Sequence, residues 1–415
     1  MSDVIERFMR YVQVDSQSDP DNEAETPSTP AQHDMARMLG DELRSLGCTD
    51  VEVDDHAYVT GTFAASAGAE KYPALMLCAH IDTSFDAPAA GVKPHVVHYE
   101  GGPLVSGVVN GETIQTTPEQ VPDLEKLVGQ DIICSDGSTL LSADDKSGVA
   151  EICSLLARLG ENPALSHPTL KLAFVPDEEI GHGAALLDLE KLGAAYGYTV
   201  DGEAVGDFNY ECFNASQVDV IVHGVTVHPG SAKGVMVNAI TVASECEQLI
   251  PQAERPEHSE GREGFYHPIA IEGSSSEARL TYILRDFDPH DFARREQVMG
   301  EVAAFLNERY GEGTVTLNVK EQYRNMAEHF EGKAFLIDNA LAANRDAGVE
   351  PRIVPVRGGT DGAQLTFRGL PCPNLATGGY NYHSIREFIP VSALEKTVDI
   401  LEHLVARFAT EEGTR

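Results

Sequence analysis

The chain has 415 residues and a formal net charge of −36, from 66 acidic against 30 basic side chains. So acidic a surface repels nucleic acid and anionic membranes, and neither is expected as a partner. No apolar run approaches the roughly 20 residues of a membrane span, and the first residues lack a basic region followed by an apolar core. We therefore expect a cytoplasmic protein, of a length that favours two domains of unequal size. The seven cysteines are scattered and free of Cys-x-x-Cys spacing, which indicates reduced thiols rather than disulfides or a zinc knuckle.

Two helix patterns and two strand patterns open the chain, and strand and helix patterns alternate from residue 131 to residue 200. Periodic apolar residues predict the helices and strands, and the polar segment 16–30 predicts a loop. A long connection over 85–130, rich in Gly, Pro and Val, indicates a functional excursion. The alternation predicts an α/β sheet with parallel strands, whose ligands gather beyond the carboxyl ends of the strands. The helices are expected at 4–12, 31–46, 146–159 and 184–192, and the strands at 51–65, 74–80, 131–136, 169–175 and 196–200.

The pattern changes near residue 210. Strands and helices then follow in an order typical of a compact α+β module, after which the α/β pattern resumes. The module is therefore an insertion, at 213–320, into a first domain made of 1–212 and 321–415. The inserted strands are expected at 218–227, 278–287 and 314–319 and its helices at 239–250 and 292–310, followed by a helix at 334–346, a strand at 352–356 and a closing helix at 391–408.

The apolar run at 74–84 ends in His80, a spacer and Asp82. Because side chains alternate along a strand, His80 and Asp82 are expected on the same side of the backbone. That suits a metal-ligating imidazole followed by the carboxylate that orients it. A buried histidine beside a solvated aspartate fits the same residues.

Acidic residues also cluster at two later points. Asp144 and Asp145 precede a predicted helix, where an N-cap is the ordinary explanation. A carboxylate has two oxygens, however, so Asp144 suits a bridge between two metal ions roughly 3.5–4 Å apart, with Asp145 as a cap or support. Glu178 and Glu179 follow the strand at 169–175, and neighbouring side chains point in different directions. One can therefore ligate metal while the other serves as general base, although solvated surface acids fit the pattern too.

Asp201 and His383 complete a candidate ligand set. Each alone fits a turn or a structural role. Together with the earlier candidates they supply two imidazoles and three carboxylates, which suits a pair of zinc ions. The set is His80, Asp144, Glu179, Asp201 and His383.

Motifs that span both predicted domains carry a resemblance to a known family. They are HIDTS at 80–84, ADDK at 143–146, PDEE at 176–179, YTVDG at 198–202, VHPGSAKGVMVNA at 227–239, GFYH at 264–267, RDFD at 285–288, RGGTDGA at 357–363 and GGYNYH at 378–383. In these motifs the sequence resembles the peptidase T family of tripeptide aminopeptidases. That family belongs to the co-catalytic zinc exopeptidases and deacylases that carry an inserted lid or dimerisation domain.

The resemblance implies a ligand assignment for each metal. His80 and Asp201 would bind one ion, Glu179 and His383 the other, and Asp144 would bridge them. The cofactor would be two Zn²⁺ per subunit, although carboxylate-rich sites also accept Mn²⁺ or Co²⁺.

By the same resemblance, Asp82 orients His80 and Glu178 is the general base. The implied activity is release of the N-terminal residue from tripeptides by attack of a metal-bridging water. The implied fold is a zinc-exopeptidase-like α/β catalytic domain with a mixed, largely parallel sheet, plus an inserted α+β lid domain.

The resemblance also implies substrate-binding residues. His228 and Arg285 of the lid domain and Arg357 of the catalytic domain would face the substrate, with Asn381 as a backbone contact. His228 suits a developing oxyanion, and the arginines suit a peptide carboxylate held by bidentate hydrogen bonds. Ordinary surface ion pairs fit the arginines as well.

Alternative functions and assemblies stay open at this point. A related di-zinc dipeptidase or N-acyl amino acid deacylase would carry the same metal site. A non-catalytic metal or peptide binder on the same fold would be expected to have lost the acid at Glu178. The lid domain is compatible both with a monomer and with a homodimer formed through that domain.

Overall fold

The computed structural model describes residues 2–414. The chain divides into two compact units, each with its own sheet and hydrophobic core. We call them the main unit, which comprises Met1–Tyr210, Glu328–Val354 and Thr360–Arg415, and the inserted unit, which comprises Glu211–Ala327 and Pro355–Gly359.

An eight-stranded sheet forms the centre of the main unit, in the order β1-β2-β8-β3-β9-β16-β10-β15. The central strand β3 runs parallel to β8 and β9, and β1 and β2 add an antiparallel edge. Every residue of β3 is buried, as expected for a parallel strand that is covered on both faces. The strands are β1 Thr49–Val53, β2 Val59–Phe63, β3 Leu75–His80, β8 Leu170–Val175, β9 Tyr196–Val200, β10 Asp207–Asn209, β15 Arg352–Ile353 and β16 Asn374–Leu375.

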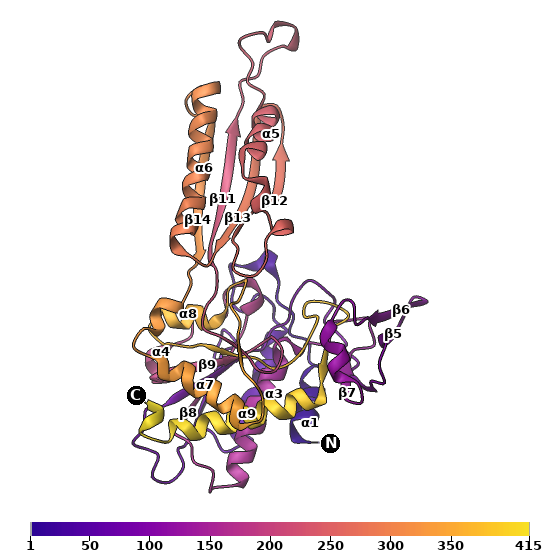
Figure 1. Cartoon of the computed structure of the whole chain (residues 1–415), viewed down its shortest axis with the longest axis vertical. Helices are drawn as coiled ribbons and strands as arrows, with labels where there is room; N and C mark the ends of the chain where they lie inside the picture. The colour runs from indigo at the N-terminus through magenta and orange to yellow at the C-terminus, as the bar shows by residue number, and fades with distance from the viewer. Residues whose placement is uncertain (1, 415) are drawn as a thin grey trace. The chain divides into compact units, whose positions relative to one another are not determined.

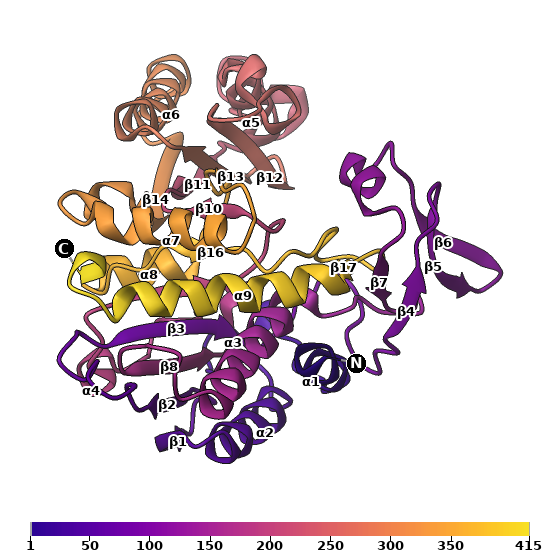
Figure 2. The same cartoon turned by 60° about the horizontal axis from the view of Figure 1, so that its bottom comes forward.

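Helices cover this sheet, and α3 lies beside α9 and α1 (Figure 2). The helix α3 is buried along almost its whole length, because it packs against β3 and β9 as well as against helices. The helices of the main unit are α1 Asp3–Tyr11, α2 Gln32–Ser45, α3 Ala143–Glu161, α4 Leu189–Leu192, α7 Ala334–Asp346, α8 Asp361–Phe367 and α9 Val391–Phe408.

Several predicted elements differ from the structure in this unit. The helix expected at 184–192 is shorter, as α4, and so is the strand expected at 352–356, as β15. The single strand expected at 51–65 is the hairpin β1–β2, because the Asp54 carboxylate accepts the amides of His56 and Tyr58 and turns the chain. The strand expected at 131–136 does not join the main sheet. It is β7, Asp131–Cys134, and it pairs antiparallel with β4, His95–His98, and β17, Phe388–Pro390.

The excursion at 85–130 contains β4, the hairpin of β5, Leu104–Val109, and β6, Glu112–Thr116, and a short 3-10 helix (Figure 2). Its hairpin supports the segment that carries His383. The side-chain amide of Asn381 donates to Thr116 Oγ1 at 3.1 Å, and Arg386 Nε donates to the Gln115 carbonyl at 3.1 Å. The excursion therefore positions a candidate metal ligand.

The inserted unit is a four-stranded antiparallel sheet, in the order β12-β13-β11-β14, with two helices on one face (Figure 1). The sequence predicted three of the strands but not β12, which is mostly exposed and interrupted by Pro268, so that it lacks an apolar alternation. The elements are β11 Asn214–His223, α5 Ala239–Leu249, β12 Phe265–Gly273, β13 Glu277–Asp286, α6 Pro289–Tyr310 and β14 Val315–Tyr323.

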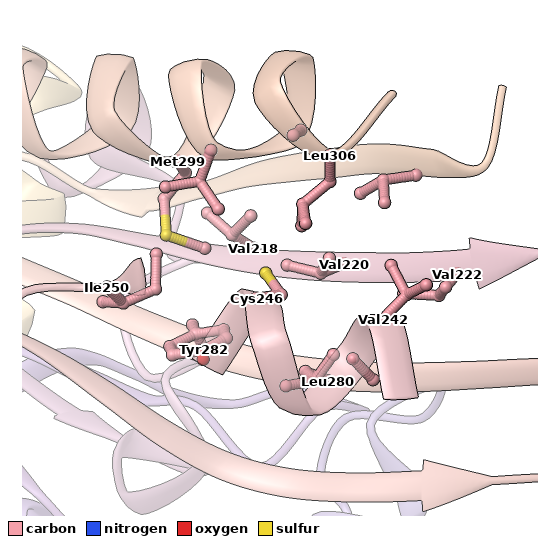
Figure 3. Close-up of a cluster of buried hydrophobic side chains, with 14 of the residues drawn as sticks. Val218, Val220, Val222, Val242, Cys246, Ile250, Leu280, Tyr282, Met299 and Leu306 are labelled. Atoms are coloured by element: carbon pink, nitrogen blue, oxygen red, sulfur yellow. The ribbon is translucent and has the colours of Figure 1, made fainter. Parts of the chain in front are cut away.

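The core of the inserted unit lies between its sheet and its helices (Figure 3). Alternate residues of one strand share a face, which places Val218, Val220 and Val222 of β11 in this core. Leu280 of β13 contributes beside them and is 1% exposed.

Leu280→Ala is expected to lower the free energy of unfolding by about 2–5 kcal/mol, because it removes buried methyl groups and leaves a cavity. Urea denaturation followed by far-UV circular dichroism measures this, since the chain contains no tryptophan. The matched control is Ile269→Ala on β12, where the side chain is 50% exposed and the expected change is within about 0.5 kcal/mol. Equal effects of the two substitutions would contradict the assigned core.

Candidate metal centre

The carboxyl ends of three neighbouring strands bring the candidate ligands together. His80 is the last residue of β3, and it lies in register with Val175, the last residue of β8. Glu179 follows β8 closely, and Asp201 directly follows β9. Because the three strands are parallel, their ends lie at the same edge of the sheet.

The Asp144 carboxylate lies between two imidazoles. His80 Nε2 is 2.9 Å from Asp144 Oδ1, and His383 Nε2 is 3.3 Å from Asp144 Oδ2. Asp201 Oδ1 lies 3.8 Å from His80 Nε2, and Glu179 Oε2 lies 3.0 Å from His383 Nε2. The structure thus brings all five predicted ligands into two groups that share Asp144.

These residues fit a pair of divalent cations. Glu179 Oε1 is buried and has no hydrogen-bond partner among residues 2–414. Burial, and then the nearby charge of Asp144, raise the pKa of Glu179 to about 7 and that of Asp201 well above its usual range. Such crowded carboxylates repel one another unless cations lie between them, and imidazole with carboxylate is a donor set that suits zinc.

Asp82 is fully buried and has two tasks. His80 Nδ1 lies 3.1 Å from the main-chain carbonyl of Asp82 and 3.3 Å from Asp82 Oδ1, so both oxygens of this residue can orient the ring. The same carboxylate accepts the backbone amides of Glu178 at 3.0 Å and Glu179 at 3.2 Å. Asp82 therefore also fixes the backbone that carries the predicted base and one ligand, which the sequence did not indicate.

The Asp145 carboxylate lies next to the candidate ligands. Its carboxylate lies close enough to His80 and Asp201 to complete a second metal-binding group. Its Oδ2 accepts the backbone amide of His80 at 3.1 Å, and its Oδ1 accepts the backbone amide of Gly148 at 3.2 Å. We interpret Asp145 as a support for the His80 backbone.

Glu178 is partly buried at the start of a short 3-10 helix, Glu178–Ile180. Burial, and then the negative charge of Asp361, raise the pKa of Glu178 well above its usual value. A carboxylate with a raised pKa accepts a proton from water more readily and can release it later.

Sequence reasoning missed further supporting carboxylates. Asp86 Oδ2 lies 3.1 Å from His383 Nδ1, in the same relation that Asp82 has to His80. Asp177 accepts the amide of Ser28 at 2.7 Å and the side-chain amide of Gln32 at 2.6 Å, which ties the loop at 16–30 to the residues beside the base. The sequence pattern did not indicate these roles, because Asp86 and His383 are 297 residues apart and Asp177 and Ser28 are 149 residues apart.

The predicted substrate-binding residues lie in both units. His228 is exposed in a turn of the inserted unit, where its Nδ1 accepts the Gly230 amide at 3.1 Å. Arg285 lies on β13, with its guanidinium 5.2 Å from the centre of the Tyr323 ring. Asn381 lies in the main unit. Their substrate contacts stay predictions.

Arg357 requires a correction, because the sequence analysis placed it in the catalytic domain. It lies in Pro355–Gly359, which belongs to the inserted unit. Its guanidinium donates to the carbonyls of Gly261 at 2.7 Å and Glu263 at 3.1 Å and lies over the Phe213 ring. These contacts hold the segment against the inserted unit, although its neighbours in sequence return to the main unit.

The sequence and the fold are similar to those of known proteins. Residues 210–314 match the family model described as the peptidase dimerisation domain. The structure of aminopeptidase PepT from Bacillus cereus is similar over 98% of each chain, with a TM-score of 0.77 at 23% identity. A dinuclear metal-binding peptidase of the M20 family from Bacillus subtilis is similar over 97% of this chain and 96% of its own, with a TM-score of 0.64 at 14% identity. The fold is thus that of the M20 peptidases.

Curated relatives show which family within this class the chain belongs to. Peptidase T from Vibrio atlanticus is 45% identical over 99% of each chain. Peptidase T from Caldanaerobacter subterraneus is 43% identical over 98% of each chain. The chain therefore belongs to the peptidase T family, which confirms the predicted family, the fold class and the assignment as a peptidase.

The comparisons define the metals less closely than the sequence prediction does. They support a metallopeptidase with a dimerisation domain and candidate metal-binding residues. The identity and number of the metals stay predictions. Within residues 2–414, no helix is both long enough and apolar enough to cross a membrane.

Proposed function

We propose that this chain is a di-zinc aminopeptidase that releases the N-terminal residue from tripeptides. The observation that carries the proposal is the position of Asp144 between the imidazoles of His80 and His383, with Glu178 next to the ligand Glu179. Membership of the peptidase T family supports the substrate class. A structural relative from Staphylococcus aureus, with a TM-score of 0.76, is described as a tripeptidase.

The proposed ligands divide into two groups. His80 and Asp201 would hold one Zn²⁺ and His383 and Glu179 the other, with Asp144 available to both groups. Mn²⁺ or Co²⁺ would suit the same oxygen-rich set. When bound, such a pair of cations polarises the scissile carbonyl and lowers the pKa of water.

The chain's own side chains then move the proton. Glu178 accepts a proton from the attacking water and passes it to the leaving amine. Its raised pKa suits it to hold that proton between the two steps. Asp82 keeps Glu178 in place, because it binds the Glu178 amide and the His80 ring with one carboxylate.

We keep Arg285 and Arg357 as candidates for the substrate carboxylate and His228 for the oxyanion, with Asn381 as a backbone contact. Carbonyl oxygens, the Ser259 hydroxyl and aromatic rings contact the two guanidinium groups, and none of these contacts carries a negative charge. We also propose a homodimer formed through the inserted unit, since that unit matches the peptidase dimerisation domain.

A panel of small substrates tests the proposed activity. The zinc-loaded protein is assayed on tri-alanine, di-alanine, tetra-alanine and N-acetyl-alanine, with Leu-Gly-Gly to identify which end is cut. We expect tri-alanine to give a kcat/KM at least about tenfold above the others. The products of Leu-Gly-Gly should be leucine and Gly-Gly. Preference for di-alanine or for N-acetyl-alanine would favour the dipeptidase or the deacylase instead.

A further inference from the structure

Glu387 is a buried carboxylate whose partners are all backbone amides of one segment. Its side chain is 1% exposed. Its Oε2 accepts the amides of Leu141 at 2.7 Å and Ser142 at 2.9 Å, and its Oε1 accepts the amide of Asp144 at 3.0 Å. The three amides belong to the turn that leads into α3 and carries the shared ligand Asp144.

That turn cannot be held by the helix that follows it. Ser142 has a φ of 68°, in the left-handed region that side chains other than glycine adopt only under constraint. Asp144 and Asp145 also have non-helical backbone angles. Amides at the start of a helix have no partner within the helix, so their direction depends on an outside acceptor. Glu387 is that acceptor.

Glu387 is also tied to the segment that carries His383. It follows His383 by four residues, and its own amide donates to the Ser384 carbonyl at 3.1 Å. The next residue, Phe388, begins β17 and pairs with β7. One side chain therefore joins the turn of Asp144 to the turn of His383, which face each other at 3.3 Å.

We propose that Glu387 is a positioning residue that sets the Asp144 carboxylate relative to His383 and thereby the affinity of the centre for divalent cations. The proposal rests on the metal assignment of the proposed function. It adds a residue that touches neither the cations nor the substrate.

Replacing Glu387 with glutamine tests its bond to the Asp144 amide. Glutamine has one acceptor oxygen and one NH₂ donor where glutamate has two acceptors. In Glu387→Gln the oxygen can keep the two bonds to Leu141 and Ser142. The NH₂ group then faces the Asp144 amide, which is itself a donor. The substitution thus disturbs the backbone of Asp144 and leaves the rest of the turn bound.

The test uses the full-length protein after removal of metal with a chelator. Zn²⁺ binding is measured by titration against a competing chromophoric chelator, and Co²⁺ binding by its visible absorption. We expect Glu387→Gln to weaken cation binding by roughly 10–100-fold. The matched control is Glu395→Gln, an exposed glutamate on α9, which should bind like the unaltered protein. Far-UV circular dichroism of the metal-free proteins reports folding.

The outcomes are separable. Equal affinity in Glu387→Gln and the unaltered protein overturns the proposal. Loss of the folded signal in metal-free Glu387→Gln also overturns it, because Glu387 would then be needed for the fold rather than for the centre. Weaker binding, with turnover that recovers at high Zn²⁺, supports it. Failure of the unaltered protein to bind cations would instead refute the metal assignment, and cleavage of another substrate would leave this inference intact.

Discussion

Glu178→Gln is expected to lower kcat on tri-alanine by about 10²–10⁴-fold while both metals stay bound. Glutamine has nearly the same shape but cannot accept the proton of the attacking water. The Asp82 carboxylate binds the backbone amide of residue 178, so the substitution leaves the loop in place. Steady-state kinetics measure the loss, and elemental analysis of the dialysed protein measures the metal content.

The control for this variant is Glu190→Gln, which makes the same chemical change at an exposed position of α4. It should retain the activity of the unaltered protein. Near-normal turnover by Glu178→Gln would show that another group takes the proton. Loss of metal from this variant would show instead that Glu178 is a ligand.

Asp144→Asn is expected to remove at least one cation and to reduce turnover by about 10³-fold or more, because several kcal/mol of metal stabilisation are lost. Asp144 presents one oxygen to His80 and the other to His383. Asparagine replaces one of these oxygens with an NH₂ donor, which cannot bind a cation. Metal content after dialysis against a weak chelator gives the readout.

Asp55→Asn, at an exposed position of the main unit, is the control for this variant. It should keep the metal content of the unaltered protein. Retention of both cations by Asp144→Asn would contradict the assignment of Asp144 as the shared ligand.

The sequence was informative where chemistry coincides with local structure. His80 ends an apolar run and Asp201 follows another, so both could be placed at the edge of a parallel sheet before the sheet was known. Glu178 and Glu179 follow a third buried strand, where the sequence fits a metal ligand beside a general base as well as solvated surface acids. For these residues, the strand pattern and the residue type pointed to the same edge.

The sequence pattern did not indicate the residues that support the site. Glu387 lies in an ordinary polar turn, and its three amide partners are more than 240 residues away. Asp177 reaches Ser28 across 149 residues, and Asp82 acts on amides nearly 100 residues further along. A bond from a side chain to a distant backbone amide requires no particular residue at the amide. The sequence therefore shows the residue whose side chain accepts the bond, but not the residue whose backbone amide donates it.

The sequence by itself determined the α/β class and predicted an inserted unit and a candidate ligand set around His80 and Asp144, because local periodicity and residue chemistry carry that information. Only the tertiary structure decided which strands pair, as with β7 in a separate small sheet, and to which unit Arg357 belongs. It also decided that Asp82 and Glu387 hold the backbones of Glu178 and Asp144. The physical reason is that pairing partners and backbone acceptors are set by the path of the whole chain, which no single stretch of residues specifies.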